Sequence, residues 1–212
     1  FTVDVLMQRI TRAVERHNVF QPTYKLIDQR RQREAIRSAA AAENAHPRYA
    51  ADFVRLRAEL HVSLGEHPEA EHLYTAMLGV KQVGWASLGL ARTLFAQGRI
   101  EEAENVLTQL VSVNPKLMAA YDLLAKCHEA NGSAARAQQV LEEAVAISPH
   151  MVRRLRHLGE VALDAGDVGA AEKSFKQVVS KAKYSEFRDP EDHVNLVKTL
   201  VQKGDATQAS GV

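Results

Sequence analysis

Histidine and cysteine are the residue types in this chain that could bind a metal ion or act as a nucleophile. The densest group of histidines lies in the stretch HVSLGEHPEAEH and comprises His61, His67 and His72. Two histidines that share a metal ion on one helix lie four residues apart, and no pair in this group has that spacing. We therefore expect exposed polar histidines, no metal site and no cofactor.

Cys127 is the single cysteine, and His128 follows it directly. Adjacent residues on a helix point to different faces, and no third partner is evident, so we expect Cys127 to pack as a small apolar side chain. A lone cysteine excludes an intrachain disulfide bond and favours a reducing, cytoplasmic setting. The chain also lacks a glycine-rich phosphate loop and a nucleophile elbow, so we do not expect an enzyme.

The charge of the chain is balanced. Among its 212 residues 25% are charged and 46% hydrophobic, and the net charge is +1. Such a composition is typical of a globular protein without a general attraction to nucleic acid or membrane, and no apolar run approaches the ~20 residues that span a bilayer. The most basic stretch, residues 25–37, carries five positive and two negative charges without interleaved aromatic residues, which favours a solvated helical face.

The elements that position these residues follow from a segment that the chain repeats. The stretch EEAENVLTQLVSVNP, residues 101–115, returns in similar form as ARAQQVLEEAVAISP, residues 135–149. A glycine, an alanine, a leucine or aromatic residue, and a proline recur at this same interval. The matching residues are Gly98, Gly132 and Gly166; Ala103, Ala137 and Ala171; Leu107, Leu141 and Phe175; and Pro115 and Pro149.

Each recurring residue type has a physical role in a pair of helices. Glycine ends the first helix because it adopts the left-handed conformation at little cost, and proline stops the second helix. The alanine lets the two helices approach, and the leucine or aromatic side chain fills the space between them. The apolar residues run at helical spacing without sustained alternation. We predict an all-α protein of about ten to twelve helices that turns near Gly65, Gly98, Gly132, Gly166 and Gly204.

The pattern resembles the tetratricopeptide repeat, a helix-turn-helix unit of about 34 residues. The resemblance covers roughly residues 50–212, with units 50–83, 84–117, 118–151, 152–185 and a partial unit 190–212 that includes Ala209. Before the partial unit, we expect Asp189 to cap a new helix with Pro190 in its first turn. Residues 21–49 are expected to form a basic linker and a capping helix. The resemblance implies a right-handed α-solenoid whose first helices line a groove for a peptide or partner helix.

The groove positions of the first helices hold a mixed set of side chains that leans basic and includes the only tryptophan. These residues are Arg55, Glu59, Trp85, Leu88, Arg92, Asp122, Lys126, Glu129, Arg153, Arg156, Glu160 and Lys198. Tryptophan and arginine are enriched in binding hot spots, so we expect a protein ligand with acidic residues around an apolar anchor. The alternative is that these are ordinary solvated charges, with Trp85 packed between neighbouring units. The lysine–asparagine arrangement that grips a terminal carboxylate in some family members is absent.

Residues 1–20 lie outside the repeat and form an amphipathic pattern with Leu6, Ile10 and Val14 on one side. The stretch resembles the last helix of the receiver domain of bacterial response regulators, in which an aromatic residue such as Phe1 precedes the helix. This resemblance implies the output region of a two-component response regulator in a phosphorelay, with the receiver domain before Phe1. Two alternatives stay open: a free-standing scaffold or assembly chaperone of the secretion or pilus type, and a regulatory appendage of an enzyme.

In a receiver domain the apolar face of this helix lies on a sheet, and the present chain shows no sheet. Leu6, Ile10 and Val14 therefore need another cover. The solenoid can provide it by folding the helix back over its first units, and a second copy of the chain can provide it by pairing of the same face about a two-fold axis. We favour the second copy, and so expect a homodimer.

Overall fold

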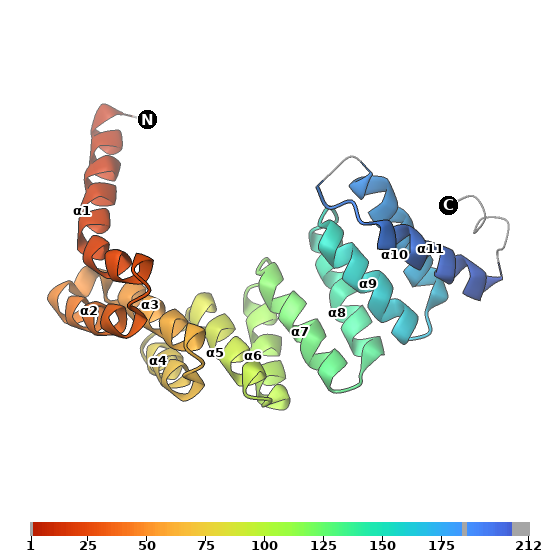
Figure 1. Cartoon of the computed structure of the whole chain (residues 1–212), viewed down its shortest axis with the longest axis horizontal. Coiled ribbons are helices and arrows are strands. Elements are labelled where there is room, and N and C mark those ends of the chain that lie inside the picture. Colours follow the sequence, from red (N-terminus) through yellow and green to blue (C-terminus); the bar gives the residue numbers. More distant parts are fainter. Residues whose placement is uncertain (1, 184–185, 205–212) are drawn as a thin grey trace. The chain divides into compact units, whose positions relative to one another are not determined.

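The computed structural model describes residues 2–183 and 186–204. Within these residues it contains eleven α-helices, one short 3₁₀-helix and no strand (Figure 1), which confirms the all-α prediction. The chain divides into two compact units, residues 1–98 and 99–212. Ala209 of the expected partial repeat lies outside the described residues.

Unit 1 holds the first five α-helices: α1 (Val3–Asp28), α2 (Gln32–Ala45), the 3₁₀-helix η1 (Pro47–Tyr49), α3 (Ala50–Ser63), α4 (His67–Val80) and α5 (Gly84–Ala96). Unit 2 holds the other six: α6 (Ile100–Val113), α7 (Met118–Ala130), α8 (Ala134–Ile147), α9 (Val152–Asp164), α10 (Val168–Ala182) and α11 (Pro190–Lys203). Successive helices pack against each other within each unit, as α3 and α4 do in the first and α9 and α10 in the second.

The turns are built by the glycines of the repeat. Gly65, Gly98, Gly132, Gly166 and Gly204 all have positive φ, between 69° and 85°, as the sequence predicts. At the α7–α8 turn the backbone N–H of the residue after the glycine donates to a carbonyl five residues earlier, at 2.8 Å. This bond is the mark of a Schellman cap, which needs a left-handed residue at the turn.

Two helix pairs of unit 2 differ in the sizes of the residues that face each other in their cores. Ala125 of α7 and Leu141 of α8 share one buried cluster. In the next pair the larger Phe175 of α10 lies against Gly159 of α9, where an added Cβ would come within 2.8 Å of the ring. Between these two pairs of unit 2, the larger side chain on the second helix is matched by the smaller residue on the first.

The first helix is longer than expected. It continues past residue 20 to Asp28 and includes Pro22. Phe20 stacks on Phe53 with ring centroids 4.1 Å apart, and the hydroxyls of Thr23 and Ser38 lie 3.0 Å apart. These contacts bury the part of α1 that the sequence pattern assigns to a linker, and so they extend the helix.

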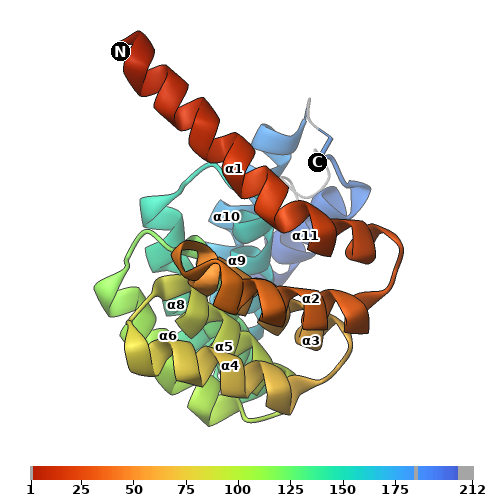
Figure 2. The same cartoon turned by 90° about the vertical axis from the view of Figure 1, so that its left-hand side faces the viewer.

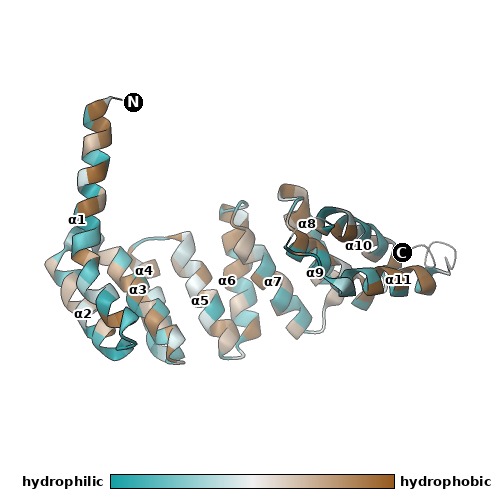
Figure 3. Cartoon of the chain, turned by 45° about the horizontal axis from the view of Figure 1, so that its top comes forward, coloured by the Kyte–Doolittle hydropathy of each residue, from teal (hydrophilic) through white to brown (hydrophobic). Residues whose placement is uncertain are grey.

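The amino-terminal part of α1 projects beyond the other helices of unit 1 (Figures 1 and 2). Every residue from 2 to 18 is exposed. Figure 3, which colours the ribbon by residue hydropathy, shows brown hydrophobic positions along this part of the helix. Leu6 is 54% exposed, Ile10 48% and Val14 53%. Unit 1 thus leaves an apolar helix face of α1 uncovered.

At the other end of the chain α11 begins as the sequence predicts. Asp189 occupies the N-cap, and its side chain accepts a hydrogen bond from the backbone N–H of Glu191 at 3.0 Å. Pro190 occupies the first helical turn, where its missing N–H costs nothing.

Candidate peptide-binding site

Five of the predicted groove residues, all in unit 1, surround one pocket. They are Arg55, Glu59, Trp85, Leu88 and Arg92. The pocket has a volume of about 150 Å³ and is also lined by Val62, Tyr74 and Gly89. A cavity of roughly this size accommodates a benzene ring, so the pocket can hold one apolar side chain.

Two aromatic rings, those of Tyr74 and Trp85, line the pocket. The Tyr74 ring fits there because its neighbour on α5 is a glycine. Tyr74 of α4 is buried against Gly89 of α5, where an added Cβ would lie 2.4 Å from the tyrosine ring. Trp85 meets Tyr74 edge-on, with the ring centroids 6.3 Å apart. Burial raises the pKa of Tyr74, so this phenol stays neutral at physiological pH.

Two arginines stand at the rim of this pocket. The Arg55 guanidinium lies 5.7 Å from the centroid of the Trp85 ring, and its Nε donates to Glu59 at 2.8 Å. The hydrogen bond to Glu59 raises the pKa of Arg55 further. Arg92 is exposed and has no hydrogen bond or ion pair with any residue that the structure describes. Arg92 is therefore the cation that the pocket offers to a ligand carboxylate.

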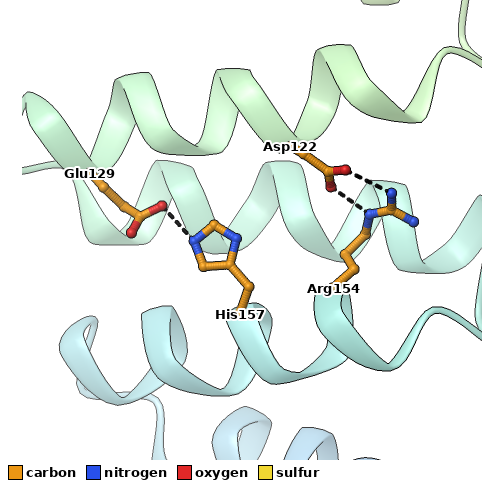
Figure 4. Close-up of polar contacts among 4 residues, drawn as sticks. All are labelled: Asp122, Glu129, Arg154 and His157. Carbon is orange, nitrogen blue, oxygen red and sulfur yellow. Dashed lines mark hydrogen bonds and ion pairs between the residues drawn. The ribbon is translucent and has the colours of Figure 1, made fainter. Parts of the chain in front are cut away.

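The groove residues of unit 2 do not form a single pocket. Asp122 of α7 accepts two hydrogen bonds from Arg154 of α9, from Nε at 2.7 Å and from Nη2 at 2.9 Å (Figure 4). The Arg154 side chain is only 2% exposed. Glu129 of α7 lies 2.7 Å from Nε2 of His157, also on α9 (Figure 4). These two acidic groove residues are thus bonded to the neighbouring first helix.

The remaining groove residues of unit 2 fall into two groups. Arg156 forms two hydrogen bonds with Asp192 of α11, at 2.5 and 2.8 Å, which raise its pKa. Lys126, Glu160 and Lys198 are exposed, as is Arg153, which lies over a different aromatic ring. The pKa of Glu160 is raised, mainly by partial desolvation of its carboxylate.

Known proteins contain helix pairs that are similar to those of this chain. The family model of the tetratricopeptide repeat matches residues 88–152. This part of the chain is therefore similar to tetratricopeptide repeats. No curated protein sequence matches the chain.

Several solved structures share this fold, and the first of them is described as a tetratricopeptide repeat protein. One from Parabacteroides merdae is 17% identical, with a TM-score of 0.70 over 92% of this chain and 76% of that chain. PilF of Pseudomonas aeruginosa is 14% identical, with a TM-score of 0.71 over 95% of this chain and 90% of that chain. PilW, a type IV pilus biogenesis factor, is 18% identical, with a TM-score of 0.67 over 92% of this chain and 89% of that chain.

A second set of polar contacts between successive repeats is not anticipated by the sequence analysis. The residue after each repeat alanine on the second helix hydrogen-bonds to the next repeat. The pairs are Glu71 with Gln97 at 2.9 Å, Glu104 with Asn131 at 3.1 Å, Gln138 with Asp167 at 2.9 Å, and Glu172 with Lys203 at 2.6 Å. In the sequence, these contacts are indicated by a glutamate or glutamine that recurs directly after each repeat alanine.

His61 and Cys127 are held by contacts within the fold. His61 Nδ1 lies 2.7 Å from the Glu66 carboxylate. The same carboxylate forms an ion pair with Arg33 at 2.7 Å. Cys127 is buried, as predicted, and burial raises the pKa of its thiol to about 11. Across the described part of the chain no three side chains of metal-binding type come together. Nor does any helix described there combine the length and apolar character needed to cross a membrane.

Proposed function

We propose that this chain is a non-catalytic protein-binding module and that the Trp85 pocket of unit 1 takes an apolar side chain of a peptide or partner helix next to an acidic residue. The observation that carries the proposal is the pocket itself. It joins a half-buried tryptophan to two arginines, of which Arg55 is already neutralised by Glu59 and Arg92 is not. Buried aromatic anchors beside arginine are typical of hot spots.

The fold supports a scaffold role. Tetratricopeptide repeats present rows of first helices, which bind extended segments of other proteins. Among the similar structures, PilW is described as a type IV pilus biogenesis factor. This likeness favours a free-standing scaffold or assembly chaperone, with a subunit of a larger assembly as the partner.

Selection of peptides from a random display library tests the ligand class. We expect enrichment of an aromatic or branched aliphatic residue flanked by aspartate or glutamate. Binding of a selected peptide should change the fluorescence of Trp85, which is the only tryptophan. The combination of Trp85→Ala with Arg92→Glu removes the fluorophore, so its binding is measured by isothermal titration calorimetry; the variant should lose binding while the helical circular dichroism persists.

The matched control for the charge change is Arg37→Glu, an exposed arginine of the same unit on α2. It should bind the selected peptide as well as the parent does. If the double variant also binds as well as the parent, the Trp85 pocket is not the site.

A second candidate function, the output region of a two-component response regulator in a phosphorelay, is favoured by the uncovered face of α1. This reading makes α1 the last helix of a cytoplasmic receiver domain, whose sheet covers Leu6, Ile10 and Val14. Phosphorylation of the receiver then changes how this face is covered.

The residues encoded before Phe1 discriminate between these readings. A receiver with a phosphorylatable aspartate supports the response regulator. A signal peptide or lipoprotein cysteine supports the assembly chaperone, and a catalytic domain on either side supports a regulatory appendage of an enzyme.

We further propose that, in this chain alone, the uncovered face of α1 pairs with a second copy about a two-fold axis near Ile10. Complete burial of a large apolar side chain contributes ~1.5–3 kcal/mol, and about half of the surface of Leu6, Ile10 and Val14 remains to be covered. Light scattering at several concentrations should show a dimer that Leu6→Asp and Ile10→Asp dissociate. Gln8→Asp, an exposed polar position of the same helix, is the control. A monomer at high micromolar concentration, or a dimer indifferent to the first two substitutions, contradicts this role of α1.

A further inference from the structure

We infer that unit 2 carries a docking pocket of its own, separate from the Trp85 pocket, which takes an apolar side chain flanked by carboxylates from a protein partner. The pocket lies between the segment that leads into α9 and the segment that leads into α11. Its lining consists of His150, Met151, Val152, Arg153 and Phe187, and its volume is about 260 Å³.

The wall of the pocket that carries Phe187 is held in place by hydrogen bonds from Arg156. Arg156 Nη2 donates to the Phe187 carbonyl at 3.1 Å. The same guanidinium is fixed by its two hydrogen bonds to Asp192, whose side chain is only 3% exposed. Asp189, two residues after Phe187, caps the start of α11. These hydrogen bonds fix the backbone position of Phe187, although the residue lies in the stretch inserted between two repeats.

The pocket is apolar where a ligand side chain would enter. Val152 is buried, whereas Met151 is 48% exposed and Phe187 is 41% exposed. These two large side chains come from different connections between helices and share one concave surface. Covering them with an apolar side chain removes apolar surface from water, which favours binding.

The charge around this surface is positive. The Arg153 guanidinium lies 5.5 Å from the centroid of the Phe187 ring, and Lys181 Nζ donates to His150 Nδ1 at 3.1 Å. No carboxylate belongs to the described lining, and Arg153 has no ion pair with a described residue. The nearest acid in sequence, Glu186, is followed after one residue by Arg188. Charge complementarity therefore selects a peptide with carboxylates beside its apolar anchor.

The Phe187 pocket and the Trp85 pocket share an arginine that lies over an aromatic ring, but they differ in whether that arginine has an ion-pair partner. In both, an arginine of a first helix lies over an aromatic ring. Arg55 is paired with Glu59, whereas Arg153 is unpaired within the described chain. An acidic peptide should therefore depend more strongly on Arg153 than on Arg55.

The methionine methyl groups allow a direct test, because the chain has only four methionines and Met151 is the one in this pocket. The probe is the capped peptide Asp-Glu-Phe-Glu-Asp, titrated into protein carrying ¹³C-methyl methionine. We expect a saturable shift of the Met151 methyl signal. Replacing the peptide's phenylalanine by serine, or its four acids by lysine, should weaken binding at least tenfold.

Two protein variants complete the experiment. Arg153→Glu should weaken binding at least tenfold, and Arg136→Glu, an exposed arginine of α8 in the same unit, should leave it unchanged. Trp85 fluorescence in the same titration reports the other pocket, so failure of one site is distinguishable from failure of the other.

Three outcomes overturn the proposal: no Met151 shift at millimolar peptide, equal shifts with the serine peptide, or binding that survives Arg153→Glu. A Met151 shift that follows protein concentration without peptide would instead make a second copy the occupant. A shift of the same size with a single-stranded oligonucleotide would make the surface a general anion site, and either result contradicts a peptide pocket.

Discussion

Replacing Gly159 with alanine should destabilise unit 2, although the same change stabilises an ordinary helix. A Cβ at this position would lie 2.8 Å from two carbon atoms of the Phe175 ring, well inside van der Waals contact. Phe175 is fully buried and cannot move into solvent. Overpacking of this kind costs about 1–3 kcal/mol, and the helix propensity of alanine returns about 1 kcal/mol, so we expect a net loss of about 1 kcal/mol.

The sharper measurement is a double-mutant cycle with Phe175→Leu. That single change leaves a void and should also be destabilising. Together the two changes recreate the alanine–leucine combination of Ala125 and Leu141 in the preceding repeat. The double variant should therefore be more stable than the sum of the single effects predicts, by a coupling energy of about 1–2 kcal/mol.

Urea unfolding followed by circular dichroism, with amide hydrogen exchange in α9 and α10, measures these differences. Gly79→Ala on α4 is the control, because an added Cβ there meets nothing within 4 Å and should stabilise the helix. A stabilising Gly159→Ala, or additive effects in the double variant, would refute the size compensation between the two helices.

Three further predictions concern the turns, the ion pairs and the thiol. Gly132→Val should destabilise by ~1 kcal/mol or more in urea unfolding, because φ is +69° at this position. Asp122→Ala and Arg154→Ala should each cost ~1.5–3 kcal/mol in the same assay, and the double variant should cost less than their sum, since both remove one bidentate pair. Cys127, with its pKa raised to about 11, is a thiolate in roughly one molecule in a thousand at pH 8, so mass spectrometry should show slow alkylation by iodoacetamide that accelerates in urea.

The sequence predicts the parts of this fold that depend on one residue type at one position. Only glycine adopts positive φ cheaply, so its recurrence marks the turns without knowledge of any contact. The start of α11 is equally local, since Asp189 and Pro190 act within the first turn. The extent of α1 is different. Phe20 stacks on Phe53, which belongs to α3, and no local pattern indicates that this contact extends the helix.

For the candidate site, the sequence predicts helix faces and not the partners of individual side chains. Helical phase assigns Asp122 and Arg156 to the predicted groove side of their helices. It does not show that Arg154 and Asp192 bind them, because those partners come from neighbouring repeats, far along the chain. The Phe187 pocket depends on an insertion that breaks the repeat, so a search for regular spacing passes over it.

The pairing of the predicted groove charges supports the proposal of an acidic ligand, although the net charge of the chain is only +1. Three of the four acidic groove residues, Glu59, Asp122 and Glu129, are bonded to basic side chains of the protein. The fourth, Glu160, has a raised pKa. Four of the six basic groove residues have no ion pair with a described residue: Arg92 in unit 1, and Lys126, Arg153 and Lys198 in unit 2. Three of these four carboxylates thus already have partners within the protein, whereas four cations do not. A ligand with carboxylates beside its apolar anchor would meet unpaired cations in either unit, whereas a basic ligand would compete with the partners that these carboxylates already have.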